Sequence, residues 1–256
     1  MLVMTNKELV KKLKDVATNY KTLYVMGCFG APMTEANKER YINHHEYNRR
    51  TAPKKSIKAA SADTFGFDCV CLIKGILWGW SGKTSATYGG AKYAANGVPD
   101  VSADGMIAKC SDLSTDFSKI EVGEAVWTKG HIGIYIGDGL AVECTPKWNN
   151  KVQITACNRS VNGYNRRNWT KHGKLPYIEY VKENAVQPAK TALAVGDRVK
   201  LAADATIYGK TSKFASFVYK STLYVREING NRVVVSTLKT GAVTGAVDVK
   251  YLTKIE

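Results

Sequence analysis

The chain has 256 residues, which is enough for one large or two modest domains with a buried core. Hydrophobic residues make up 45% and charged residues 23%, and these fractions exclude a wholly disordered or low-complexity chain. Lys and Arg outnumber Asp and Glu by 37 to 22, and the net charge of +15 favours a polyanionic partner such as nucleic acid, an anionic membrane face or an anionic cell wall.

The first part of the chain contains two predicted helices with a polar segment between them. Residues 8–20 repeat apolar side chains at helical spacing, and residues 69–80 are apolar over a length that suits a buried helix. Between them, His44 and His45 lie in a highly polar stretch that is typical of a solvated surface. The sequence therefore predicts no chemistry for these two histidines.

The second predicted helix begins in a way that suits a reactive cysteine. Asp68 is a good N-cap residue, and Cys69 then lies in the first helical turn. Unpaired N–H groups and the helix dipole there favour the thiolate, which is the nucleophilic form, and can also stabilise an oxyanion. Most free cysteines are simply small buried hydrophobes, an interpretation that stays open for Cys69 and is favoured for Cys71.

The sequence begins without the apolar block of a secretory signal and has no apolar run near the roughly 20 residues that span a bilayer. We therefore predict a protein made in a cytosol, with free thiols in place of a disulfide framework. The Cys69-x-Cys71 spacing does not match common zinc knuckles, so no metal or cofactor is predicted. The six cysteines concerned are Cys28, Cys69, Cys71, Cys110, Cys144 and Cys157.

A predicted strand after residue 122 carries the candidate general base. Ile132, Ile134 and Ile136 alternate onto one face, which places His131 on the opposite face. A fourth histidine, His172, lies in a polar context and is expected to be exposed. His131 is therefore the histidine best placed for catalysis.

The turn after this strand decides whether a carboxylate reaches His131. If residues 137–139 form a three-residue loop, Gly133 pairs with Glu143, and His131 lies diagonal to Glu143 on the same face. Glu143 can then orient the imidazole as the third member of a Cys-His-Glu triad, whereas a two-residue loop would move it to the wrong face. Trp148, in the polar loop that follows, is expected to line the substrate groove.

A polar, proline-containing stretch at residues 183–193 is the predicted linker between a domain of residues 1–182 and a domain of residues 194–256. The second domain has an Asn-Gly hairpin signal and four short predicted strands, at residues 197–201, 223–228, 232–236 and 243–249. We predict an α+β first domain, in which the helix bearing the cysteine packs on an antiparallel sheet bearing the histidine, and a small all-β barrel after it.

The quoted residues resemble a family. Phe-Asp-Cys at a helix start, Gly-His-Ile-Gly-Ile-Tyr-Ile-Gly-Asp-Gly on a strand and a polar residue twelve positions after the histidine resemble the NlpC-type papain-like cysteine peptidases, which hydrolyse bacterial peptidoglycan. The stretch from Leu23 to Gly27 is similar to that family's Tyr-x-Trp-Gly, whose tyrosine flanks the cysteine, and this implies a substrate-binding role for Tyr24. The chain departs from the pattern at Val70-Cys71, where Ser-Gly is usual, and at Glu143, where His, Asn or Gln is common.

The C-terminal part resembles the bacterial Src-homology-3-type domains that tether wall hydrolases to their substrate. A catalytic domain followed by such a domain, without a leader, resembles phage and prophage endolysins, which stay in the host cytoplasm until lysis and then reach the cell wall. The resemblance implies peptidoglycan and anionic wall polymers of a Gram-positive host as partners, with no nucleic acid and no membrane insertion. It leaves the oligomeric state open.

The leading hypothesis is a peptidoglycan hydrolase in which Cys69 attacks an amide of the stem peptide, His131 acts as base and then acid, and Glu143 orients His131. The intermediate is a thioester. Asp68, beside the nucleophile, is grouped with Tyr24 and Trp148 as substrate-binding. Two alternatives remain: the same triad cutting the bond between N-acetylmuramic acid and L-alanine, or a non-catalytic basic module that binds wall polymer or nucleic acid.

Overall fold

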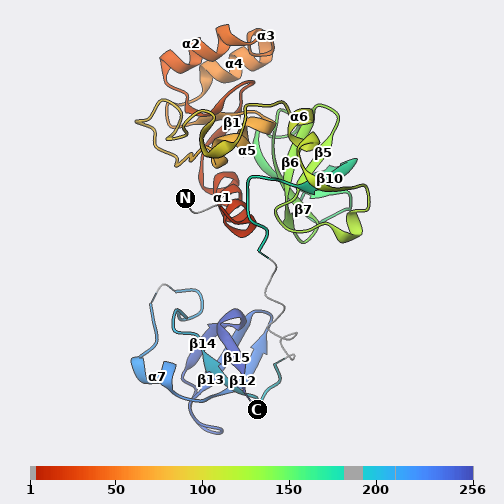
Figure 1. Cartoon of the computed structure of the whole chain (residues 1–256). Helices are drawn as coiled ribbons and strands as arrows, with labels where there is room; N and C mark the ends of the chain where they lie inside the picture. Colours follow the sequence, from red (N-terminus) through yellow and green to blue (C-terminus); the bar gives the residue numbers. More distant parts are fainter. Residues whose placement is uncertain (1–3, 182–192, 211, 256) are drawn as a thin grey trace. The chain divides into compact units, whose positions relative to one another are not determined.

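The computed structural model describes residues 4–181, 193–210 and 212–255. Within them the chain is a mixed α+β protein, as predicted. It divides into two compact units, Met1–Val181 and Lys182–Glu256 (Figure 1). The predicted linker lies outside the described residues except for its last position.

The first unit alternates helices with short strands before it becomes a sheet. Its helices are α1 (Asn6–Asn19), α2 (Glu35–His44), α3 (Glu46–Arg49), α4 (Thr51–Ala59), α5 (Cys69–Leu77) and α6 (Ala103–Ala108). Its strands are β1 (Thr22–Tyr24), β2 (Phe29–Pro32), β3 (Phe65–Phe67), β4 (Ser111–Ser114), β5 (Ala125–Thr128), β6 (His131–Gly137), β7 (Leu140–Thr145), β8 (Lys151–Cys157), β9 (Arg166–Arg167) and β10 (Lys171–Lys174).

These strands form two sheets, one in the order β1-β3-β2 and one in the order β4-β10-β5-β6-β7-β8-β9. Helices α1 and α5 pack against the β6, β7 and β8 part of the larger sheet. The core between them includes Leu9, Leu13 and Val16 of α1, Leu72, Ile73 and Ile76 of α5, and Ile132, Ile134 and Val142 of the sheet. The isoleucines on one face of β6 therefore pack in this core, and His131 lies on the opposite face.

Both helices predicted from apolar spacing are present. A capping box starts α1, in which the Thr5 side chain accepts from the Glu8 N–H and the Glu8 carboxylate accepts from the Thr5 N–H. Helix α5 ends at Leu77, three residues before the predicted end at residue 80. Gly79 follows with a φ of 89°, a conformation that ends helices readily because glycine has no Cβ.

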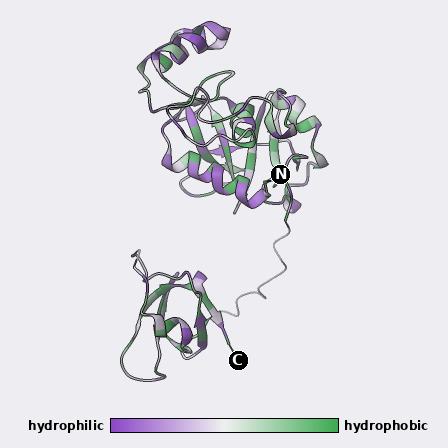
Figure 2. Cartoon of the chain, turned by 60° about the vertical axis from the view of Figure 1, so that its left-hand side comes forward, coloured by the Kyte–Doolittle hydropathy of each residue, from purple (hydrophilic) through white to green (hydrophobic). Residues whose placement is uncertain are grey.

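Residues 35–59 fold into helices α2, α3 and α4, which the sequence pattern did not predict. Figure 2 colours this segment, at the top of the unit in Figure 1, mainly hydrophilic. Its anchor is a polar side chain, because the fully buried Asn48 amide donates to the carbonyls of Met26 and Tyr41 at 2.9 Å each and accepts from the Met26 N–H. Three buried apolar side chains of these helices, Tyr41, Ile42 and Ile57, also pack in the core, but so few positions give little hydrophobic periodicity to detect.

The second unit is a five-stranded antiparallel sheet in the order β14-β13-β12-β11-β15 with one short helix. All four predicted strands are present, with shifted ends, and a fifth strand and the helix are additional. The hairpin between β12 and β13 turns at Gly230, whose φ is 55°. The elements are β11 (Arg198–Leu201), α7 (Ser216–Lys220), β12 (Leu223–Asn229), β13 (Arg232–Ser236), β14 (Gly245–Asp248) and β15 (Leu252–Lys254).

Across residues 4–181, 193–210 and 212–255, none of the helices combines the length and apolar character that crossing a bilayer requires.

Candidate active site

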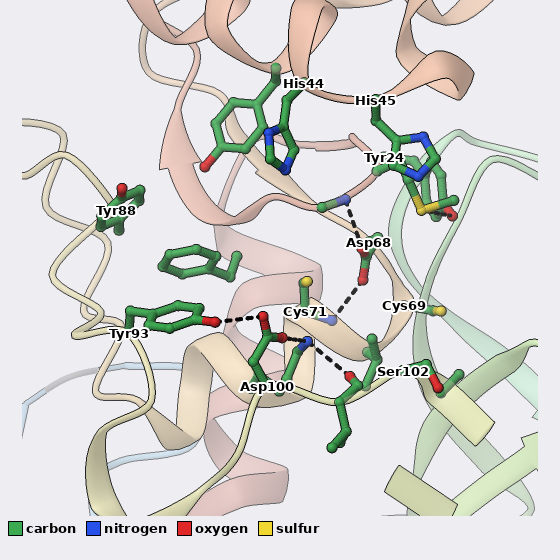
Figure 3. A pocket seen from close by; sticks show the side chains of 18 of the residues that line it. Tyr24, His44, His45, Asp68, Cys69, Cys71, Tyr88, Tyr93, Asp100 and Ser102 are labelled. Atoms are coloured by element: carbon green, nitrogen blue, oxygen red, sulfur yellow. Dashed lines mark hydrogen bonds and ion pairs between the residues drawn. The ribbon is translucent and has the colours of Figure 1, made fainter. Parts of the chain in front are cut away.

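Cys69 occupies the first turn of α5, as predicted. The Asp68 carboxylate caps the helix by accepting from the Cys71 N–H at 2.7 Å, and its second oxygen accepts from the Gly27 N–H at 2.8 Å. Two backbone donors therefore hold Asp68 in place, so its role is to fix the start of the helix and the loop around Gly27. Figure 3 shows the sulfurs of Cys69 and Cys71 pointing to different sides of the helix.

The expectation of a stabilised thiolate at Cys69 needs correction. Burial raises the pKa of the Cys69 thiol to about 12, and the neighbouring Asp68 charge adds to the rise. The N–H groups of Ile132, Val70 and Cys69 itself oppose this shift without overcoming it. Desolvation of a thiol that is only 7% exposed outweighs the helix N-terminus, so the resting form is the thiol. Formation of the thiolate at neutral pH therefore requires a base that takes this proton.

This pKa gives a testable pH dependence for alkylation. We expect the rate at which iodoacetamide modifies Cys69 to rise about tenfold per pH unit between pH 7 and 9, because only the thiolate reacts. Peptide mapping by mass spectrometry assigns the modified cysteine, since all six cysteines are free and buried. A rate that is already constant from pH 7 upward would show a preformed thiolate and contradict the raised pKa.

The hairpin that carries His131 and Glu143 has the predicted register but a different turn. Ile134 pairs with Val142 as the three-residue loop requires, yet Gly137 pairs with Leu140, so the loop itself has two residues. A register shift between Tyr135 and Gly137 restores the alignment. The two loop residues, Asp138 and Gly139, both have positive φ, which is the geometry that tight hairpins favour. An extra residue in β6 thus offsets the shorter loop.

His131 and Glu143 meet on the face of the sheet opposite α5. His131 Nε2 lies 2.6 Å from Glu143 Oε2, and the Glu143 side chain is fully buried. Trp169 stacks on the imidazole, with ring centroids 5.4 Å apart and planes 7° from parallel. Within the described residues Nδ1 of His131 has no hydrogen-bond partner. The carboxylate therefore fixes one ring nitrogen and leaves the other available for a proton.

Glu143 is held by two further residues that the sequence did not indicate. Arg167 donates to both carboxylate oxygens, from Nη2 at 2.6 Å and from Nε at 3.0 and 3.1 Å, and Thr155 Oγ1 donates at 2.7 Å. Burial opposes ionisation, but the hydrogen bonds from His131 and Arg167 outweigh it and hold the pKa of Glu143 below its ordinary value. Glu143 is therefore a charged acceptor at neutral pH.

Trp148 does not lie where the sequence predicted. It is not among the residues that line the pocket beside Cys69. Its ring lies against Arg167 instead, with the guanidinium carbon 4.9 Å from the Trp148 centroid and 5.7 Å from that of Trp169. The two indoles enclose the cation that binds Glu143, so Trp148 helps to fix that carboxylate.

Gly133 provides the space in which His131 and Glu143 meet. A Cβ at Gly133 would lie 2.8 Å from the Val142 carbonyl oxygen, 3.2 Å from the Trp169 ring and 3.3 Å from Glu143 Cβ. We expect Gly133→Ala to displace the hydrogen-bonded pair and lower activity by at least about tenfold, with loss of stability in thermal unfolding. Full activity in Gly133→Ala would contradict this tight arrangement.

The structure brings Cys69 close to the backbone on either side of His131, and the described contacts include no hydrogen bond between the two side chains. Helix α5 packs against β6, and the N–H of Ile132, the residue after His131, acts on the Cys69 thiol. Gly130, the residue before His131, lines the same pocket as Cys69. Catalytic hydrogen bonds are often long or absent in unliganded enzymes and form when substrate binds.

A pocket of about 670 Å³ opens beside Cys69 (Figure 3). Tyr24 lines it next to the cysteine, because β1 pairs with β3 and sets Tyr24 opposite Phe67, two residues before Cys69. His44 and His45 are exposed as predicted, but both line this pocket, a role that the sequence did not suggest.

The prediction for His172 is wrong. His172 is 2% exposed, and its Nδ1 is hydrogen-bonded to the buried Glu124 carboxylate while Nε2 lies 3.1 Å from the Asp116 carbonyl oxygen. Strand β10 lies inside the sheet between β4 and β5, so a short polar sequence is covered on both sides. This buried pair is satisfied within the fold and is separate from the pocket.

No model of a known protein family matches the chain, and a search of curated proteins finds none with significant similarity.

Proposed function

We propose that this protein is a peptidoglycan hydrolase of the cysteine peptidase type, with Cys69 as nucleophile, His131 as general base and acid, and Glu143 as the residue that orients His131. The observation that carries the proposal is the buried His131–Glu143 pair at 2.6 Å on the strand against which the N-terminus of the Cys69 helix packs. A nucleophile at a helix start, a base on a strand and a buried carboxylate behind the base are the parts that nucleophilic acyl transfer needs.

The proposed reaction has two balanced steps. His131 Nδ1 takes the Cys69 proton as the sulfur attacks the carbonyl carbon of a substrate amide, and N–H groups of the first turn of α5 stabilise the oxyanion. The C–N bond then breaks, the leaving nitrogen takes the proton from His131, and a thioester remains on Cys69. Water attacks the thioester with His131 again as base, releasing the carboxylic acid and the free thiol.

The raised pKa of Cys69 suits this use of a base. A thiol that stays protonated until substrate displaces water is protected from side reactions, and its proton then needs an acceptor close by. Glu143, ionised and fully buried, stabilises the imidazolium that forms. Arg167 compensates part of that negative charge and fixes the carboxylate geometry.

The finer parts of the proposal rest on the resemblance of the sequence motifs. We propose a papain-like arrangement of the NlpC type for the first unit and a Src-homology-3-type, wall-binding role for the second. The net charge of +15 supports a substrate rich in anionic polymers, such as the wall of a Gram-positive host. An endolysin that waits in the host cytoplasm and meets the wall at lysis fits these properties.

End-group analysis of digested walls tests the proposal. Purified Gram-positive walls are incubated with the full chain, with the chain after iodoacetamide treatment, and with the chain in EDTA. We expect turbidity to fall, new peptide amino and carboxyl termini to appear, activity to be lost after alkylation, and activity to persist in EDTA. Free lactyl carboxyl groups with N-terminal alanine would identify the bond to N-acetylmuramic acid instead. Binding to walls of several compositions without release of any fragment would overturn the hydrolase proposal.

A further inference from the structure

The pocket beside Cys69 extends well beyond the nucleophile. One wall is α5, a second is the segment of residues 88–103, and a third is formed by α2 and the start of α3 (Figure 3). In Figure 3 Cys69 lies at one end of this space and Tyr88 and Tyr93 at the other. A volume of about 670 Å³ is that of a site for several residues of a substrate, so the wall opposite α5 is in a position to select among substrates.

The two carboxylates that line the pocket, Asp68 and Asp100, already have hydrogen-bond or ion-pair partners within the protein. Both oxygens of Asp68 accept from backbone N–H groups. Asp100 forms an ion pair with Lys74 and accepts from the Tyr93 hydroxyl at 2.9 Å. Lys74 uses another proton on the Val101 carbonyl at 2.9 Å, so its charge is balanced within the fold. Neither carboxylate is left to bind a cationic substrate group, and Lys74 is not left to bind an anionic one.

Arg40, the cation on the α2 wall, has no such carboxylate partner among the described residues. Arg40 forms no ion pair with any described residue, and its Nη2 donates to the neutral Tyr88 hydroxyl at 2.8 Å. Its guanidinium carbon lies 5.1 Å from the Tyr88 ring centroid and 5.7 Å from that of Tyr41. Aromatic faces hold a guanidinium in place while leaving other N–H groups free, so Arg40 is oriented but keeps donors for a ligand.

Two imidazoles lie on the same wall. His44 ends α2 and forms no hydrogen bond with the described residues, while His45 Nδ1 accepts from the Tyr47 N–H at 3.1 Å and leaves Nε2 free. Gly27 lies beneath His44, and a Cβ there would be 3.6 Å from His44 Cδ2, so the ring rests close to the loop that Asp68 fixes. Arg40, His44 and His45 are three neighbouring donor groups on a wall of the pocket without a carboxylate.

We propose that this wall, Arg40, His44 and His45, is a carboxylate-binding subsite that selects acidic stem peptides. The inference rests on the proposed function and adds the substrate class: a stem peptide whose glutamyl residue presents a free carboxylate. A guanidinium binds a carboxylate through two parallel hydrogen bonds, a geometry that a carboxamide does not reproduce because its nitrogen repels the same donors. The subsite binds substrate at a distance from the reacting bond and takes no part in proton transfer.

Two synthetic stem peptides that differ only at the glutamyl group, carboxylate in one and carboxamide in the other, test the proposal. Binding is measured by calorimetry with the full-length Cys69→Ala protein, and hydrolysis is measured with the protein that keeps Cys69. We expect the carboxylate peptide to bind at least about tenfold more tightly, in line with the strength of charge-assisted hydrogen bonds. Arg40→Gln, added to each protein, removes this preference while leaving affinity for the carboxamide peptide nearly unchanged.

Arg49→Gln is the matched control, because it removes the same charge from the neighbouring helix α3 at a residue that does not line the pocket. We expect it to keep the preference, and Arg40→Lys to retain part of it. Equal affinity for both peptides, or an undiminished preference in Arg40→Gln, overturns the subsite. A preference that disappears in Arg40→Gln without hydrolysis of either peptide supports the subsite and contradicts the hydrolase. Hydrolysis of both peptides with equal kcat/KM supports the hydrolase and contradicts the subsite.

Discussion

Replacing His131 with alanine is expected to lower kcat for wall hydrolysis by about a thousandfold or more, with KM little changed. Burial raises the pKa of the Cys69 thiol, so under the proposed mechanism the loss of His131 removes the base that generates the nucleophile. The imidazole contacts Glu143 and Trp169 and does not line the pocket, and its loss should therefore affect turnover more than binding. Release of soluble fragments at several wall concentrations separates the two parameters.

The double variant Cys69→Ala/His131→Ala supplies the control for this prediction. Residues that act as one unit are not additive, so the double variant should lose no more activity than the more damaging single variant. Thermal unfolding of each variant checks that the fold is intact. A His131→Ala protein with more than about a tenth of normal kcat would contradict the role of His131 as base.

Arg167→Ala is expected to destabilise the first unit by about 3–5 kcal/mol, which is the usual cost of removing one partner of a buried ion pair. Arg167 forms three hydrogen bonds with the fully buried Glu143 carboxylate, and it is enclosed by two indole rings. Without it, Glu143 would be a buried charge with fewer donors. Arg166→Ala is a matched control, because Arg166 is the exposed neighbour and contacts only Asn168 among the described side chains.

The Arg167–Glu143 ion pair also predicts how the free energy of unfolding varies with pH. The pKa of Glu143 is below its ordinary value because the hydrogen bonds of His131 and Arg167 outweigh burial, so its contribution is present above the unfolded-state pKa and is lost as pH falls through the folded-state pKa. Urea unfolding should therefore show a large gap between normal protein and Arg167→Ala at pH 7 that narrows in acid. A gap of equal size at every pH would show that Arg167 acts only through packing.

The positions of three candidate site residues in the fold could be predicted because their signals are local. A capping residue followed by an apolar helix places Cys69, and strand alternation places His131 on the face away from the core. Glu143 follows from hairpin register, although the actual loop has two residues and an extra strand residue corrects the alignment. Alternation on β7 keeps Glu143 on the His131 face. The predicted pairing register is therefore correct, although the predicted three-residue loop is not.

Arg167 and Trp169 could not be predicted because they reach the site through a long return of the chain. Strand β9 pairs in parallel with β8, which sets Arg167 beside Cys157, and no spacing in the sequence indicates this crossover. Nothing local distinguishes half-buried Arg167 from exposed Arg166 before the sheet order is known.

The pocket wall formed by α2 and α3 was missed for a different reason. Its helices carry only a few buried apolar side chains, Tyr41, Ile42 and Ile57, and hydrogen bonds of the buried Asn48 amide add to them, so a solvated surface is the simplest interpretation of residues 41–50. The Cys69 pKa also depends on tertiary structure, because helix position favours the thiolate whereas burial by neighbouring elements opposes it. In both cases the deciding contacts come from segments distant in sequence.

Whether Cys69 is the nucleophile is tested by comparing the normal protein with Cys69→Ala and with Cys71→Ala on the same purified walls. Fragment release and wall binding are measured together, and Cys71→Ala removes a buried thiol from the same helix without touching the proposed chemistry. We predict that Cys69→Ala binds walls normally but releases fragments about a thousandfold more slowly, while Cys71→Ala stays active. Fragment release by Cys69→Ala at the rate of the normal protein would show that Cys69 is not the nucleophile.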